Sequence, residues 1–197
     1  MNQKLPSEQT KMLELRSLME DSLEVLRTYR HDLMNQVQLI HSYSQMKKYD
    51  RLQGPIQNLI AEARRHTEMS AIASSMISYV VLSRDICYPM LQVHATCEQA
   101  ELPTLSIESK AAELLFDLLN MVGQHSMRQF EPLRLDLSIV LWGQAFEIGW
   151  HYDRSEHIED VPDFSRWGEA WAPQGIVMKQ HQEEAGIEYS IRFQVQE

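Results

Sequence analysis

The sequence predicts an α+β fold, in which a long N-terminal helical hairpin precedes a helix-plus-sheet α/β sandwich. In the first 45 positions, apolar or aromatic residues recur at steps of three, four and seven, which is the spacing of a helix seam: Met12, Leu15, Met19, Leu26, Tyr29, Leu33, Ile40 and Tyr43. Residues 133–141 and 187–195 instead alternate apolar and polar side chains, as half-buried strands do. We therefore expect a hairpin domain at residues 1–75 and a sandwich domain at residues 76–197.

The hairpin is expected to contain two helices joined by a tight turn. The first runs from about Ser7 to Lys47, after a short tail. The turn lies at Tyr49 and Asp50, and Asp50 is the expected N-cap of the second helix, which ends near residue 75. One hairpin buries little apolar surface, whereas two hairpins from two chains form a four-helix bundle. The pattern therefore predicts a homodimer.

The second half is expected to mix helices and strands. The expected elements are one or two helices at residues 76–99, a short strand at 103–107, a helix at 109–124, strands at 133–141 and 145–152 around a turn at 143–144, loop and short helix at 153–174, and a strand at 187–195. Residues 176–178 are either the pairing strand or part of a helix.

His31 lies off the helix seam. Its neighbours one or two turns away on the same helix face are all polar: Glu24, Arg27, Thr28, Asn35, Gln38, Ser42 and Gln45. A core histidine would have apolar neighbours three and four residues away. The imidazole is therefore expected to point into water.

This setting suits a nucleophile. Imidazole titrates near neutrality, so a ring nitrogen lone pair is available at cellular pH. Asp32 could hold one ring nitrogen by a hydrogen bond and leave the other free to attack. Arg27 and Arg30 could neutralise an incoming phosphoryl group. The plain alternative is a solvated surface histidine with no chemical role.

Three stretches carry a resemblance to a known family: Arg30-His31-Asp32-Leu33-Met34-Asn35, Gln38-Leu39-Ile40 and Lys48-Tyr49-Asp50-Arg51. They resemble the phosphoacceptor helix and turn of the sporulation initiation phosphotransferase B family. The first stretch is also similar to the Arg-His-Asp-x-x-Asn class of sensor kinase dimerisation domains. The resemblance implies that His31 carries a phosphoryl group, that the adjacent Asp32 assists it, and that Asn35 lies one turn on.

The resemblance further implies a phosphorelay in sporulation initiation, with response regulator receiver domains as partners. Arg27, Arg30 and Gln38 are then expected to bind the phosphoryl group or the partner. Transfer would depend on positioning and charge neutralisation, with Mg²⁺ carried by the receiver domain. We expect this chain itself to bind no cofactor and no metal ion.

The second half resembles the ATP-binding domain of histidine kinases, but in a degenerate form. Residues 114–126 resemble the asparagine box, and its two asparagine positions hold Asp117 and Met121. A thioether is a poor ligand for Mg²⁺. No glycine cluster precedes residue 176, where only Gly175 remains, whereas phosphate-cradling loops need glycines. A kinase-like fold without nucleotide binding is expected; the plain reading of residues 114–122 is a core-facing helix.

The amino-acid composition limits which partners and which kinds of site the protein is expected to have. The net charge of −10 argues against nucleic acid or an anionic membrane as the main partner. The two cysteines, Cys87 and Cys97, show no metal-binding spacing and indicate reduced thiols in the cytoplasm. A metal-dependent phosphohydrolase site that adds His41 and His66 to His31 is a weaker alternative, since no dense cluster of ligands follows.

Three functions remain open. The leading hypothesis is a histidine phosphotransferase that moves phosphoryl groups between response regulators without ATP. The second is an ATP-dependent sensor histidine kinase fragment, against which the missing glycine boxes argue. The third is a non-enzymatic dimeric scaffold in which His31 is merely solvated.

Overall fold

The structure is a computed structural model, and it describes residues 8–99, 101, 103–153, 162–183 and 186–194. The chain divides into two compact units, Met1–Ala61 and Glu62–Glu197, and the boundary in the sequence falls within the helix Gln53–Ser70. Helices come first and a mixed sheet follows, so the predicted α+β fold is confirmed. The domain boundary expected after residue 75 stays a prediction.

The first unit holds the first helix and the beginning of the second helix of a helical hairpin. Helix α1 (Glu8–Gln45) is followed by a 3-10 turn, η1 (Tyr49–Arg51), and by α2 (Gln53–Ser70). The prediction that Asp50 caps the second helix is wrong, because Asp50 lies inside η1 and α2 begins three residues later. Pro55 falls in the first turn of α2, where the N–H that proline lacks would have no partner within the helix.

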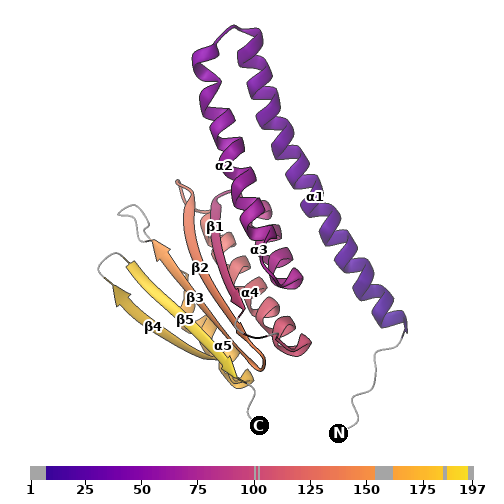
Figure 1. The fold of residues 1–197 in the computed structure, drawn as a ribbon, viewed down its shortest axis with the longest axis vertical. Coiled ribbons are helices and arrows are strands. Elements are labelled where there is room, and N and C mark those ends of the chain that lie inside the picture. Colours follow the sequence, from indigo (N-terminus) through magenta and orange to yellow (C-terminus); the bar gives the residue numbers. More distant parts are fainter. Residues whose placement is uncertain (1–7, 100, 102, 154–161, 184–185, 195–197) are drawn as a thin grey trace. The chain divides into compact units, whose positions relative to one another are not determined.

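The described residues of the second unit form a five-stranded sheet and three α-helices that lie wholly within the unit. Its elements are α3 (Ser75–Cys87), β1 (Leu91–Gln99), α4 (Leu105–Ser126), β2 (Leu133–Trp142), β3 (Ala145–Asp153), α5 (Phe164–Trp171), the 3-10 turn η2 (Ala172–Gln174), β4 (Val177–Glu183) and β5 (Gly186–Gln194). The strand order is β1-β2-β3-β5-β4 (Figure 1). β1 and β2 are parallel and α4 connects them, while all other pairs are antiparallel.

Two predicted elements are corrected. The helical prediction for residues 76–99 is right only as far as Cys87, because Leu91–Gln99 is strand β1. The short strand predicted at residues 103–107 is instead the start of α4, where Thr104 is the N-cap and its side chain accepts a hydrogen bond from the Ile107 N–H. The strands near 133–141, 145–152 and 187–195 are confirmed, and β4 is the strand that pairs with β5.

One face of the sheet forms the core of this unit. Leu137, Trp150 and Tyr189 are buried on this face. They are register partners on the neighbouring strands β2, β3 and β5, because Leu137 pairs with Trp150 and Trp150 pairs with Tyr189. Trp150 stacks on Tyr189 with ring centroids 5.5 Å apart, and Phe164 of α5 lies 4.5 Å from Tyr189 between centroids. The buried residues of α3 and α4 join the same hydrophobic core.

Candidate functional site

His31 lies in the middle of α1, and its side chain is 73% exposed. The seam residues Tyr29 and Leu33 on either side of it are half-buried, so the helix turns its apolar stripe away from the histidine. The imidazole is therefore accessible to a second protein.

The side chains of Asp32 and Asn35 both lie close to the same ring nitrogen of His31, Nδ1. Asp32 Oδ1 lies 3.0 Å from Nδ1, and the Asn35 amide lies 3.3 Å from Nδ1 one turn further along the helix. A carboxylate accepts a hydrogen bond, so the pair with Asp32 assigns the proton to Nδ1. The Asn35 atom at this distance is the amide nitrogen Nδ2, which is itself a donor, so Asn35 lies beside Nδ1 without accepting its proton. Nε2 keeps its lone pair and has no partner in the described part of the chain.

The other predicted site residues surround this group without contacting it. Arg27 is paired with Glu24 at 3.3 Å, and both side chains are exposed. Arg30 is exposed and has no ion-pair partner among the described residues. Gln38 is also exposed, and its backbone oxygen accepts a hydrogen bond from Ser42. The structure thus brings together His31, Asp32 and Asn35, while Arg30 is the nearby cation left available for a ligand.

The helical part of the chain matches a known family. Residues 12–72 fit the family model of the sensor kinase SpoOB-type, alpha-helical domain. His31 and its two neighbours Asp32 and Asn35 lie inside the matched segment, on α1. No sequence among the curated proteins matches this chain.

Two solved structures of histidine kinases align with most of the chain at low similarity. Histidine kinase ThkA, in complex with response regulator protein TrrA, aligns with a TM-score of 0.42 and 10% identity over 97% of this chain and 67% of that chain. Acinetobacter baumannii histidine kinase AdeS gives a TM-score of 0.42 and 8% identity over 83% of this chain and 97% of that chain.

The histidines of the alternative metal site, His41 and His66, have different neighbours from His31. His41 Nε2 lies 2.9 Å from the Gln45 amide nitrogen on α1. His66 lies 3.1 Å from Asp85 in the second unit. Among the described residues, no group of three or more His, Cys, Asp or Glu side chains is placed to hold a metal ion. No described helix is long and apolar enough to span a membrane.

A buried carboxylate on α3 anchors the C-terminal part of α2. Asp85 on α3 receives hydrogen bonds from Arg65 at 3.1 Å, His66 at 3.1 Å and the Val93 N–H at 3.0 Å. Burial by itself would raise the pKa of Asp85. The hydrogen bonds from His66 and Val93 and the charge of Arg65 outweigh this, so the pKa lies below its usual value. Asp85 therefore stays ionised and ties α2 to α3 and β1.

The asparagine-box positions lie on α4. Asp117 is exposed, and Met121 packs against the hydrophobic core. The neighbouring Asn120 Oδ1 accepts hydrogen bonds from Arg84 at 3.0 Å and from the Tyr88 hydroxyl at 3.1 Å. A β-carbon at Gly123 would overlap the Tyr88 ring, so α3 and α4 approach each other closely here.

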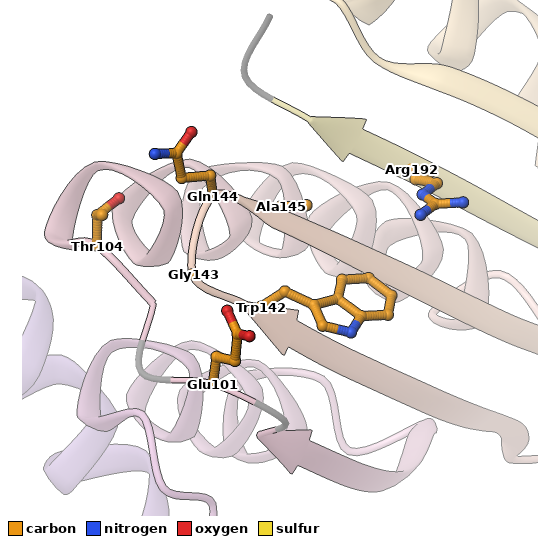
Figure 2. Close-up of a pocket in the computed structure, with 7 residues that line it drawn as sticks. All are labelled: Glu101, Thr104, Trp142, Gly143, Gln144, Ala145 and Arg192. Atoms are coloured by element: carbon orange, nitrogen blue, oxygen red, sulfur yellow. The ribbon is translucent and has the colours of Figure 1, made fainter. Parts of the chain in front are cut away.

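A surface cavity of about 520 Å³ opens where the turn between β2 and β3 meets the start of α4 (Figure 2). Trp142 and Arg192 line it, and the Arg192 guanidinium lies 5.6 Å from the indole centroid. The Thr104 N–H donates to the Gly143 oxygen at 3.1 Å and closes one wall. Sequence patterns did not reveal this cavity, because three distant segments form it.

A second cavity, of about 410 Å³, lies over the polar face of the sheet. It is lined in part by a row of residues that are neighbours in strand register: His94, Asp136, His151 and Glu188. Each comes from a different strand, so histidines and carboxylates alternate across the sheet. The sequence shows that these four residues are polar positions within strands. It does not show that they lie side by side, because that depends on the order of the strands in the sheet.

Proposed function

We propose that this chain is a histidine phosphotransferase of a phosphorelay, which moves a phosphoryl group between the aspartates of two response regulators through phosphohistidine at His31. The observation that carries this proposal is the arrangement at His31. Its Nδ1 is hydrogen-bonded to Asp32 and lies beside the Asn35 amide, its side chain is 73% exposed, and its Nε2 lone pair faces no described residue. The family match over residues 12–72 supports the same role.

The transfer step follows from this geometry. Nε2 attacks the phosphorus of a phospho-aspartate in line, the new N–P bond forms, and the bond from phosphorus to the aspartate oxygen breaks. The aspartate leaves as a carboxylate. The ring then carries a proton on Nδ1, and Asp32 stabilises the resulting positive charge. Arg30 offers a cation to the phosphoryl oxygens, and Mg²⁺ belongs to the receiver domain. The reverse step passes the group to the second regulator.

The active form is proposed to be a homodimer. Apolar side chains are exposed along both hairpin helices, namely Met19, Leu23, Leu26, Met34, Val37, Leu39, Ile56 and Ile60. A second hairpin would cover part of this surface in a four-helix bundle. As the family resemblance implies, the relay would serve sporulation initiation in the cytoplasm of a spore-forming bacterium.

The experiment separates phosphotransfer from kinase activity. The purified protein is incubated either with labelled ATP alone or with a labelled phospho-receiver domain in the absence of ATP. Acid-labile label that appears only with the receiver supports a phosphotransferase. Label from ATP alone would instead favour the sensor kinase alternative, and no label in either arm would favour the scaffold.

A further inference from the structure

The turn of the hairpin is an exposed basic patch in an acidic protein. Residues 46–51, Met-Lys-Lys-Tyr-Asp-Arg, contain three cations and one carboxylate, whereas the whole chain carries a net charge of −10. All six residues are exposed, and Met46 and Tyr49 expose 52% and 64% of their surface. Methionine, tyrosine and arginine are enriched at protein interfaces. We call residues 46–51 the hairpin tip.

The cations of the hairpin tip have no ion-pair partner among the residues that the structure describes. Elsewhere on the hairpin, Arg16 pairs with Glu20 and Arg27 pairs with Glu24. Among the side chains described between residues 16 and 61, the cations without an ion-pair partner are Arg30, Lys47, Lys48 and Arg51. An unpaired surface cation remains available to an approaching anionic surface. Among the side chains described between residues 16 and 61, the available positive charge therefore lies beside His31 and at the tip.

The backbone at Lys47 gives an independent indication. Lys47 has φ of 57° in the left-handed region, and the Lys48 N–H donates to the Tyr43 oxygen at 2.9 Å to close the helix end. Glycine is the favoured residue at such a position, because a β-carbon is strained there. A lysine is thus present where the fold alone favours glycine, which points to a use for its side chain.

We propose that the hairpin tip docks an acidic surface of the same receiver domain that seats on His31. This proposal rests on the proposed function. Fifteen residues of helix separate His31 from the tip, which is roughly 22 Å. A domain of about 120 residues has a radius of gyration of about 14 Å, so one domain reaches both points. The tip would attract the receiver and orient it, while the chemistry stays at His31.

The test is the rate of His31 labelling by an acidic receiver domain phosphorylated with acetyl phosphate. The tip variant carries Lys47→Glu, Lys48→Glu and Arg51→Glu. Its second-order rate constant at low salt is expected to fall about 10-fold or more, because steered association depends on complementary charge. The single-turnover rate at saturating receiver is expected to stay unchanged, and the salt dependence is expected to flatten.

A matched control reverses three exposed cations of the other unit, by Arg128→Glu, Arg166→Glu and Lys179→Glu. It changes the net charge equally and is expected to stay within twofold of the wild type. Equal losses in both variants would show that only net charge matters and would overturn the tip proposal. A tip variant that behaves like the wild type would overturn it as well.

A failure of the proposed phosphotransfer can be distinguished from a failure of docking at the hairpin tip. If the wild type takes no label, equilibrium binding of the same receiver still tests the tip. Weaker binding by the tip variant than by the control supports docking, and equal or absent binding overturns it. Lys47→Gly is a second variant that tests the hairpin tip. It is expected to raise the melting temperature and to slow association with the receiver about twofold. Unchanged association would remove Lys47 from the docking surface.

Discussion

Asp32 Oδ1 and His31 Nδ1 lie 3.0 Å apart on consecutive residues of α1. This pair sets which ring nitrogen carries the proton, and so it turns the Nε2 lone pair toward solvent. A negative charge beside the ring also favours the cationic imidazole that forms during phosphoryl transfer. The proposed chemistry therefore depends on a contact between neighbours in the sequence.

Removal of the Asp32 carboxylate is expected to slow phosphorylation of His31 without unfolding the protein. Asp32→Ala should lower the single-turnover rate by about 10- to 100-fold, at the lower end of the range for proton-handling groups. Asp32→Asn should lose less, because the amide oxygen can still accept from Nδ1. Rapid-quench labelling measures both rates, and an unchanged rate in Asp32→Ala would exclude an assisting role.

The two arginines near His31 are expected to differ. Arg27 is paired with Glu24, whereas Arg30 has no partner among the described residues. Arg30→Ala should therefore slow transfer about 10-fold, and Arg27→Ala by less than about threefold, because a charge-assisted phosphate contact is worth more than a surface pair. Parallel single-turnover assays compare them. The opposite order would show that Arg27 leaves Glu24 to bind the phosphoryl group.

Dimerisation is expected to depend on the exposed seam of α1. Met19 and Leu26 expose 56% and 61% of their surface in the single chain. The double variant Met19→Glu, Leu26→Glu should sediment as a monomer, because two charges per chain would be buried in the bundle. Phe130→Glu, at a fully exposed position in the second unit, is the control and should remain dimeric. A dimeric double variant would place the interface elsewhere.

The Asp85 anchor is expected to stabilise the second unit. Asp85 has 1% of its side chain exposed, and Asp85→Ala leaves the charge of Arg65 without its partner. The free energy of unfolding should fall by about 3 kcal/mol. Asp136→Ala removes an exposed pair with Arg134 and should cost less than about 1 kcal/mol. Urea unfolding compares the two, and similar losses would contradict a special role for Asp85.

The pH dependence of stability follows from the same carboxylate. The pKa of Asp85 is lower in the folded chain than its ordinary value of 3.8, so the unfolded chain takes up this proton at the higher pH. Its contribution to stability is then complete above that ordinary value and is lost as the pH falls through the folded pKa. Asp85→Asn should flatten this acid limb in urea titrations between pH 6 and 2.5. An equally steep limb would assign the acid sensitivity to other groups.

The sequence predicts elements whose signal is local and periodic. The seam of α1 and the alternation in β2 and β5 are of this kind, and so is the contact of His31 with Asp32 and Asn35, since one- and four-residue spacings are fixed by the helix. Strand β1 was missed because its second half, Ala95-Thr-Cys-Glu, alternates small and polar residues only weakly.

Other features need the tertiary structure. Asp85 meets Arg65 and His66 across 20 and 19 residues, and no periodicity links them. In the sequence, Thr104 lies between Pro103 and Leu105 in a stretch that predicts a strand. In the structure, its side chain accepts a hydrogen bond from the Ile107 N–H, which identifies it as a helix N-cap. The row of histidines and carboxylates on the sheet depends on a strand order that places β5 between β3 and β4.

The most direct test of the central claim is to identify the phosphorylated atom. The protein is mixed with a phosphorylated receiver domain without ATP, and the product is examined by ³¹P NMR and by mapping of the labelled peptide, with His31→Ala as control. We predict one phosphohistidine, at His31, with the phosphoryl group on Nε2. Phosphate on Nδ1 would contradict the assigned role of Asp32, and label on another residue or on the His31→Ala variant would contradict the relay through His31.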